Sequence, residues 1–513
     1  MGACFGLWFG LGFGLGPASG CGEVTARTVR PVRWASGVAS RHPTRDAGGI
    51  RTFGGRDSGA PPGEADRPLV AANSEALGRL RGPAPDPRSV TQDTTCACHV
   101  RPGCPVPWPT STNEPRREHD MTTTSHEIIV LGAGYAGLIA TARLARHTRK
   151  LNTRITLVNP SPRFVERLRM HQVAAGQELT DFQIPELLAG TGVEFRQAAA
   201  TAIDPAARSV VLDDGTILRY DRLVYALGST TDTSRVPGAA DHAWTLDDPR
   251  TAHHFAQRLP EIAAAGGAVT VCGGGLTGIE AAAEIAEAHP GVSVTLVSAT
   301  EPGSMMGEKA RGHLNRVLDR LGVVRVVGVK VTKVLPDAVR LDNGELRQSD
   351  LTLWTTGVRV SPLAAEAGIQ TDENGLVITD PTLRSVSHPE IHAIGDAALV
   401  RQAWGRLHGT CQSGVVTADY TATVIARQLR GKKVKPLRFG YFHQPVSLGR
   451  RDAVIQFTRA DDTPRRWYLT GKAAAIYKEQ VSSTPPVAAK LTRYVQLPVQ
   501  LSKGGRATRR TAG

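Results

Sequence analysis

Short apolar runs alternate with helical patterns from residue 126 onward. The apolar run 127–131 ends at a glycine-rich turn, and residues 138–147 then repeat apolar positions at helical spacing. The same arrangement returns about 140 residues later, where the run 268–272 precedes a second glycine-rich turn and a helical pattern over 279–289. Strands that alternate with helices in this way predict parallel sheets. The pattern therefore predicts an α/β fold with two Rossmann-like dinucleotide-binding domains.

The first turn has the spacing GxGxxG, between a strand and a helix. The first glycine allows a tight turn, the second lets backbone N–H groups approach a pyrophosphate, and the third lets the helix pack close to the strand. The positive end of the helix dipole adds to the attraction for phosphate. We therefore expect a dinucleotide phosphate on Gly132, Gly134, Tyr135, Ala136 and Gly137.

The strand that follows this helix ends at Asn159. Such sites usually have Glu or Asp at this position, which binds a ribose 2′-hydroxyl. An asparagine can also bind a hydroxyl, but without a charge. Asn159 is therefore a candidate ribose contact that departs from the usual pattern.

The second turn places Gly273, Gly275 and Gly278 at the same spacing, and its next strand, 293–298, ends at Ser298. An acid at this strand end would repel the 2′-phosphate of NADP, so its absence removes one argument against NADPH. No arginine follows directly to favour the phosphate. The sequence leaves NADH and NADPH open.

Two connecting segments share one scheme. Residues 210–228 and 338–357 each predict two strands around a turn, Asp214-Gly215 or Asn343-Gly344, and then a third strand. The third strands end at Gly228 and Gly357. Residues 390–398 predict a further strand that ends in Gly395-Asp396.

The order of these motifs, GxGxxG, ALG, GGGxxGxE, TTG and IGD, resembles that of the two-dinucleotide-binding-domain flavoproteins, the pyridine nucleotide-disulfide oxidoreductase superfamily. The segment VSLGRRDAV at 446–454 is most similar to the type II NADH dehydrogenase branch, and the resemblance covers about residues 125–455. It implies an oxidoreductase that uses FAD and NAD(P)H. The expected domain ranges are 121–245 and 358–430 for the FAD domain, 246–357 for an NAD(P) domain inserted in it, and 431–513 for a basic C-terminal lobe.

The resemblance also implies roles for single residues. The glycines of the first turn would hold the FAD pyrophosphate, those of the second the NAD(P) pyrophosphate, and Asp396 the flavin ribityl or pyrophosphate region. Glu280 would lie near the nicotinamide, although a solvated residue in the first helical turn is the alternative. The remaining expected cofactor-binding residues are Gly228, Gly357, Gly395 and Gln412. Hydride transfer needs no dedicated acid or base, and we expect neither a catalytic residue of that kind nor a metal.

The electron acceptor stays open. Relatives that reduce disulfides carry a CxxxxC-type pair, whereas the only cysteines after residue 120 are Cys272, expected in a buried strand, and Cys411. Quinone-reducing relatives carry AQxxxQ in a helix under the flavin, and the helix expected over 410–429 keeps Gln412 but has Val416 in place of the second glutamine. The acceptor could be a quinone or a small iron–sulfur protein. The remaining alternative is a protein that senses FAD and NAD, like apoptosis-inducing factor, and has no acceptor.

The C-terminal segment is strongly basic. The chain has a formal net charge of +14, and residues 421–513 alone hold 19 basic and 4 acidic residues. This segment could lie on an anionic membrane surface, form a solvated homodimer lobe, or be a disordered basic tail. No recognition motif accompanies the charge, which argues against nucleic acid. No run of 18 apolar residues predicts a membrane span.

The first 120 residues have a different composition. They contain 14 of the 33 prolines, 18 of the 54 glycines and no lysine. We expect a disordered leader or an over-extended reading frame, with Met121 as the true start. The opening apolar run lacks a basic region, so it is a poor secretory signal, and the cysteines near Cys96 lack the spacing of a zinc site. The expected location is the cytoplasm, with attachment to the inner face of the membrane left open.

Overall fold

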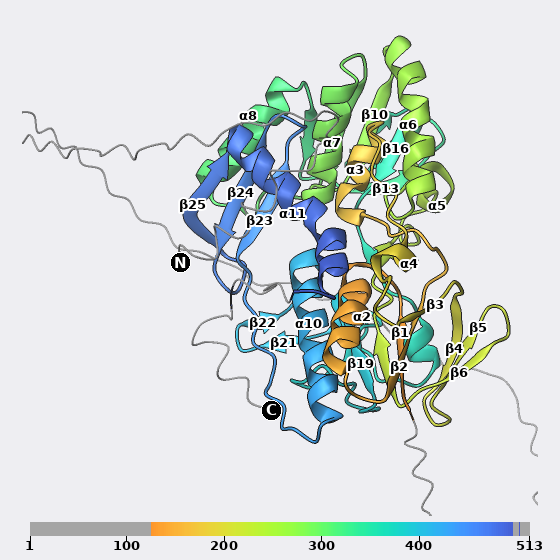
Figure 1. The fold of residues 1–513 in the computed structure, drawn as a ribbon. Coiled ribbons are helices and arrows are strands. Elements are labelled where there is room, and N and C mark those ends of the chain that lie inside the picture. The colour runs from red at the N-terminus through yellow and green to blue at the C-terminus, as the bar shows by residue number, and fades with distance from the viewer. Residues whose placement is uncertain (1–124, 496–501, 503–513) are drawn as a thin grey trace, which may run out of the picture. The chain divides into compact units, whose positions relative to one another are not determined.

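The computed structural model describes residues 125–495 and residue 502 (Figure 1). The chain divides into a unit at 1–112 and a unit at 113–513, and all described residues belong to the second. The predictions about residues 1–120, including the start at Met121 and the cysteines near Cys96, lie outside the described residues. Two five-stranded parallel sheets with helices between their strands confirm the α/β fold class.

The first sheet takes strands from both ends of the described chain. Its order is β19-β7-β1-β2-β3, and all four neighbouring pairs are parallel. These strands are β1 (His126–Leu131), β2 (Thr153–Val158), β3 (Glu194–Arg196), β7 (Arg222–Tyr225) and β19 (Ile391–Ala393). Strands β7 and β19 are neighbours in this sheet, but residues 226–390 separate them in the chain. Those residues include the strands of a second sheet, so a second domain is inserted between β7 and β19.

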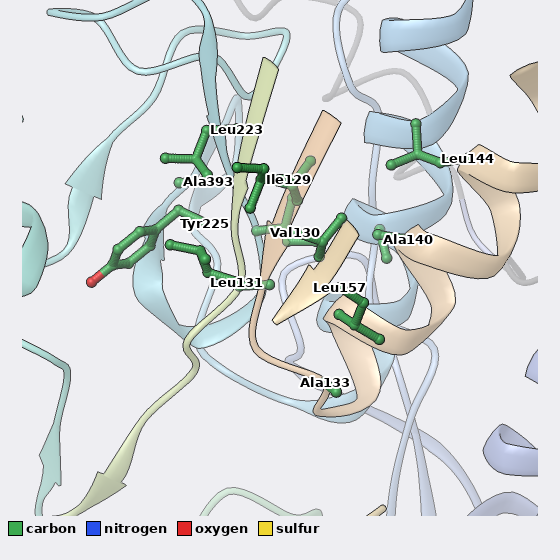
Figure 2. Close-up of a cluster of buried hydrophobic side chains, with 14 of the residues drawn as sticks. Ile129, Val130, Leu131, Ala133, Ala140, Leu144, Leu157, Leu223, Tyr225 and Ala393 are labelled. Atoms are coloured by element: carbon green, nitrogen blue, oxygen red, sulfur yellow. The ribbon is translucent and has the colours of Figure 1, made fainter. Parts of the chain in front are cut away.

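Apolar strand residues and two long helices form the core of this first domain. Helix α2 (Tyr135–Thr148) packs against α10 (Cys411–Gln428). Figure 2 shows Ile129, Val130 and Leu131 of β1 beside Leu223 and Tyr225 of β7, with Ala140 and Leu144 on α2. Such continuous apolar runs are typical of parallel strands covered on both faces.

The inserted domain has its own sheet, in the order β12-β11-β10-β16-β9. All four strand pairs are parallel. The strands are β9 (Ala243–Trp244), β10 (Ala268–Cys272), β11 (Ser293–Ser298), β12 (Val324–Val327) and β16 (Leu351–Trp354). Its helices are α6 (Pro249–Ala264), α7 (Leu276–Ala288) and α8 (Glu308–Arg320).

The first two strands of each connecting segment lie in a three-stranded antiparallel sheet, whereas the third strand, β7 or β16, belongs to a parallel sheet. The predicted turns are confirmed, since Gly215 and Gly344 have φ of +80° and +87°. The sequence missed the first strand of each antiparallel sheet, which lies ahead of the predicted segment. The strands are β4 (Ala200–Asp204), β5 (Ser209–Leu212) and β6 (Ile217–Arg219), and then β13 (Val331–Val334), β14 (Ala338–Leu341) and β15 (Leu346–Gln348).

The basic C-terminal segment is folded where it is described. Three antiparallel strands, β23 (His443–Ser447), β24 (Ala453–Thr458) and β25 (Pro464–Thr470), lead into α11 (Gly471–Leu491). Helix α11 packs on β24 and α2, with Ala474, Lys478, Ser482, Pro486 and Ala489 buried on one stripe. The alternative of a disordered tail is therefore wrong for residues 443–491. Within residues 125–495, no helix has the length and apolar character needed to cross a bilayer.

Short elements complete the description. The helical ones are η1 (Arg167–Arg169), α3 (Met170–Ala174), α4 (Ile184–Leu187), α5 (Ala239–His242), α9 (Leu363–Glu366) and η2 (Gly395–Ala397). The strands are β8 (Thr230–Thr231), β17 (Val358–Arg359), β18 (Val377–Ile378), β20 (Ala398–Leu399), β21 (Arg401–Gln402) and β22 (Gly405–Arg406).

Candidate functional site

The first glycine turn lies between β1 and α2 and has the geometry of a phosphate cradle. Gly132 has φ of +92°, and a Cβ there would lie 2.5 Å from the carbonyl oxygen of Ala226. A Cβ on Gly137 would lie 1.8 Å from the carbonyl oxygen of Gly132. The fold therefore requires glycine at both positions. Gly134 differs, because a Cβ there would meet no atom within 4 Å.

The open space at Gly134 lies at the start of α2. Gly134 is the N-cap of this helix and supplies no side-chain hydrogen bond to the first turn. The N–H groups of a first helical turn have no partner within the helix, and they carry the positive end of its dipole. A pyrophosphate fits this position, because its oxygens can accept hydrogen bonds from these N–H groups and its negative charge faces the positive end of the dipole.

The second glycine turn, between β10 and α7, repeats this geometry. Gly273 has φ of +126°, and a Cβ on Gly278 would lie 1.9 Å from its carbonyl oxygen. A Cβ on Gly275 would meet no atom within 4 Å, and this N-cap also supplies no side-chain bond. The two glycine turns thus share one geometry, and the binding of phosphate that the sequence predicts for both stays a prediction.

Asn159 supports the first turn. Its Oδ1 accepts a hydrogen bond from the Ala133 N–H at 2.9 Å, and its Nδ2 donates to the Ser161 carbonyl at 2.8 Å. At the matching strand end, Ser298 donates to the Thr300 carbonyl. The structure therefore uses the amide of Asn159 within the protein, and its contact with a ribose stays a prediction.

Asp396 lies on a pocket of about 440 Å³, within the usual size range of small-molecule sites. Its Oδ2 accepts a hydrogen bond from the Ser229 hydroxyl at 2.8 Å, directly after the Gly228 turn. A Cβ on Gly409 would lie 2.6 Å from Asp396 Oδ1, so the loop passes tightly over this carboxylate. The other residues that line the pocket are Val358, Val360, Asn374, Leu376, Gly395, Ala398, Val400, Arg406, Leu407, His408, Ser413 and Thr417.

The helix that the sequence predicts over 410–429 is present as α10. It begins at this pocket. Thr410 caps it in a capping box, in which its Oγ1 accepts from the Ser413 N–H and the Ser413 hydroxyl accepts from the Thr410 N–H, both at 3.1 Å. Ser413 and Thr417 line the pocket. The first turn of α10 thus brings the positive end of a helix dipole to the pocket wall.

Gln412 lies in the same turn, but both ends of its amide bond the protein backbone. Its Nε2 donates to the His443 carbonyl at 3.3 Å, and its Oε1 accepts from the Phe442 N–H at 3.0 Å. The side chain therefore ties α10 to the start of β23. The sequence predicted a cofactor contact here, and that contact stays a prediction.

Glu280 is buried, so the alternative of a solvated side chain is wrong. The carboxylate lies 3.0 Å from Lys478 Nζ on α11, and it accepts from the Ser447 N–H at 3.1 Å. His171 Nδ1 lies 3.7 Å away. Burial raises the pKa of Glu280, but Lys478 and His171 outweigh it and leave the pKa below its ordinary value. Burial holds the pKa of His171 at about 4, which leaves this imidazole neutral at pH 7.

The charged cluster around Glu280 extends along α7. Glu284 is one turn further on and lies 3.5 Å from Arg450, which also pairs with Glu479 of α11 at 2.8 Å. Burial raises the pKa of Glu284 to about 7, although Arg450 opposes the shift. Sequence reasoning missed this cluster, because its partners come from separate chain segments with no shared motif.

Neither described cysteine has the properties of a nucleophile. Cys272 is buried in β10, as predicted, and Cys411 begins α10. Burial raises the pKa of both thiols to about 12, so the reactive thiolate is not populated near neutral pH. Among the described residues, no group of three or more His, Cys, Asp or Glu side chains could hold a metal ion.

Known proteins match a large part of this chain. The family described as Pyridine nucleotide-disulphide oxidoreductase matches residues 126–418. A demethylphylloquinone reductase of Synechocystis is 30% identical over 354 residues, which cover 65% of this chain and 87% of that protein. A type II NADH:quinone oxidoreductase of Staphylococcus aureus is 26% identical over 393 residues, covering 71% and 96%.

The fold agrees with this assignment. The crystal structure of a sulfide:quinone oxidoreductase from Aquifex aeolicus matches with a TM-score of 0.62 and 19% identity, over 72% of this chain and 92% of that one. Both phosphate cradles, and the Asp396 loop beside α10, lie within or next to the matched segments. The chain therefore belongs to the pyridine nucleotide-disulphide oxidoreductase family, as an oxidoreductase with FAD and NAD(P)H as its cofactors.

Proposed function

We propose that this protein is an NAD(P)H:quinone oxidoreductase. The observation that carries the proposal is the pocket beside Asp396, whose lining combines polar residues at the start of α10 with apolar residues from other segments. When bound, FAD accepts a hydride from NAD(P)H and passes the electrons to an acceptor. The protein supplies binding, orientation and electrostatics.

The two domains would bind different ligands. The cradle at Gly134 would hold the FAD pyrophosphate, and that at Gly275 the NAD(P) pyrophosphate, because each leaves open space beside free helix N–H groups. Asp396, fixed by Ser229, would accept hydrogen bonds from the hydroxyls of the flavin side chain. The dipole of α10 favours the negative charge that accumulates on reduction.

The apolar wall favours a quinone as the acceptor. Val358, Val360, Leu376, Val400 and Leu407 line the same pocket as Asp396. The flavin side chain would take the Asp396 side of this pocket, and the apolar side suits a flat apolar ring with polar oxygens. The names of the Synechocystis and Staphylococcus relatives point to quinone substrates as well. A disulfide acceptor is less suited, because the two described cysteines lie on different elements and their thiols stay protonated.

The function is tested by following the flavin colour without oxygen. Mixing the purified protein with NADH, and separately with NADPH, should bleach the flavin rapidly with at least one of them. A water-soluble quinone should then restore the colour and support many turnovers. Bleaching with turnover only on an iron–sulfur protein would contradict the quinone assignment. Slow bleaching into a long-lived charge-transfer band would indicate a nucleotide-sensing protein.

We further propose that the enzyme works on an anionic membrane surface, where quinones dissolve. Trp467 on β25 is 78% exposed, Ile476 on α11 is 60% exposed, and Tyr494 beyond α11 is 63% exposed. These side chains belong to the segment 421–513, which holds 19 basic and 4 acidic residues. Each basic residue near an anionic leaflet contributes about 1 kcal/mol to binding. Exposed aromatic residues within a basic segment are typical of peripheral attachment.

Sedimentation with liposomes that contain anionic lipid tests this attachment. The protein should pellet with the liposomes at low salt and be released at about 0.5 M salt, where the Debye length falls to roughly 4 Å. Trp467→Ser with Ile476→Ser should weaken pelleting, whereas His254→Gln on the exposed side of α6 should not. Absence of pelleting at low salt would contradict the membrane proposal. A dimer in light scattering would then favour a homodimer lobe.

A further inference from the structure

His408 and Asp462 form a hydrogen-bonded couple at the pocket, outside the glycine turns and the Gly395-Asp396 motif. His408 Nε2 lies 3.0 Å from Asp462 Oδ2. Asp462 is in the turn between β24 and β25, with φ of +65°, and its side chain is only 10% exposed. Gln444 Nε2 donates to the same carboxylate at 2.8 Å. The carboxylate is therefore fixed from two sides.

Tyr441 fixes the rest of His408. The two rings are stacked, with centroids 4.3 Å apart and an interplanar angle of 11°. The Tyr441 hydroxyl accepts from the His408 N–H at 3.0 Å and donates to the His408 carbonyl at 2.7 Å. Burial raises the pKa of Tyr441 well above its ordinary value, so this hydroxyl stays a donor. The imidazole is thus oriented by a carboxylate and an aromatic ring.

The oriented imidazole is still accessible. The side chain of His408 is 54% exposed, and the residue lines the pocket that also contains Asp396. Among the described residues, its second ring nitrogen, Nδ1, has no hydrogen-bond partner. A histidine held at Nε2 by a carboxylate, with Nδ1 free and water nearby, has the arrangement of a proton donor that water can recharge.

We propose that His408, positioned by Asp462, is the acid that protonates the acceptor during its reduction. The proposal rests on the proposed function, in which the acceptor is a quinone. Reduction of a quinone to a quinol adds two electrons and two protons. The hydride from NAD(P)H brings both electrons and one proton, so one proton is still needed. The Nδ1–H bond of the His408 imidazolium breaks, an O–H bond forms on the quinone oxygen, and water returns the proton to Nδ1.

The charged groups around His408 determine the pH dependence. Asp462 lies 3.0 Å from the ring, Tyr441 is neutral, and Asp396 lines the same pocket. Arg406 on β22 also lines the pocket, but it pairs with Asp372 at 3.3 Å. Since the imidazolium is the acid, quinone turnover falls as pH rises and the proton is lost.

Two acceptors separate proton delivery from electron transfer. Ferricyanide takes single electrons and no proton, so it needs no acid. His408→Gln should lower kcat with a water-soluble quinone by about 100-fold, the lower end of general acid catalysis, and leave ferricyanide turnover and the rate of flavin bleaching by NAD(P)H unchanged. His254→Gln on α6 is the matched control, with no change for either acceptor. Flavin content and the unfolding midpoint of each variant report on folding.

The pH profile supplies a second test. In His408→Gln, the fall of quinone turnover toward high pH should disappear. Asp462→Asn should lower quinone turnover and leave ferricyanide turnover unchanged, because the imidazole loses the carboxylate that positions it. Equal slowing with quinone and ferricyanide, or an unchanged quinone profile in His408→Gln, would overturn the proposal. If the unaltered protein turns over ferricyanide but no quinone, the proposed function fails, and the role of His408 fails with it.

Discussion

Gly275→Val should abolish the reaction with NAD(P)H while the protein stays yellow. The backbone at Gly275 is extended, with φ of −72° and ψ of 177°, and its added side chain would meet no protein atom within 4 Å of Cβ. The fold therefore accepts valine. The new side chain would occupy the space left for the nicotinamide dinucleotide. The variant should therefore lose binding of this ligand and keep its fold.

The first cradle supplies the matched variant. Gly134 has φ of −67° and ψ of −171°, and its Cβ would also meet open space. Gly134→Val should therefore give a folded but colourless protein. Gly275→Val should retain FAD in full and lose kcat/KM for NAD(P)H by about 100-fold or more, since small displacements of a bound substrate already cost that much.

Absorbance at the flavin maximum, circular dichroism and stopped-flow bleaching by NADH and NADPH measure these effects. A colourless Gly275→Val protein would show that the two domains are assigned in the wrong order. An unfolded variant of either kind would show that the glycine serves the fold.

The two cradles could be predicted because their determinants are local. A strand, three glycines and a helix lie within about twenty residues of each other, and the close approach of Gly137 to the Gly132 carbonyl acts between neighbours in sequence. The contact of Gly132 with the Ala226 carbonyl, in contrast, comes from a distant segment. The turns at Gly215 and Gly344 follow from φ values that other residues disfavour. Apart from the contact of Gly132 with Ala226, these features need no knowledge of the remaining chain.

The polar partners of the site could not be predicted in the same way. Glu280 is buried only because Lys478 and Ser447 come to it from the C-terminal lobe. Gln412 is a predicted ligand contact, and the backbone bonds of its amide to Phe442 and His443 come from a distant segment. The Asp462–His408 pair forms because a turn in β24–β25 meets the loop before α10. Such contacts depend on tertiary packing, which apolar periodicity does not encode.

Lys478→Met should destabilise the folded protein by about 3–5 kcal/mol at pH 7, because it leaves the carboxylate of Glu280 buried without its cation. Lys472→Met, at an exposed position on the same helix, should change stability by less than about 0.5 kcal/mol. The double variant Glu280→Gln with Lys478→Met should recover much of the loss, because it buries no unpaired charge.

The stability of the unaltered protein and that of Lys478→Met should change in opposite directions with pH. In the unaltered protein the pKa of Glu280 is below its ordinary value of 4.5, so the stabilisation is present above that value and is lost as pH falls through the lowered pKa. Without Lys478, burial becomes the dominant influence and raises the pKa of Glu280. The variant should therefore become more stable as pH is lowered from 7 toward 5, the opposite direction. Protonation of His171, 3.7 Å away, would add to this recovery.

Urea unfolding of the FAD-bound proteins at pH 5, 6 and 7 measures the difference. The gap between Lys478→Met and the unaltered protein should narrow as the pH falls, and the double variant should show no such trend. A gap that stays constant across this range would mean that Glu280 is already protonated in the folded protein, and that Lys478 stabilises the lobe by packing its methylene groups against α7 and not by its charge.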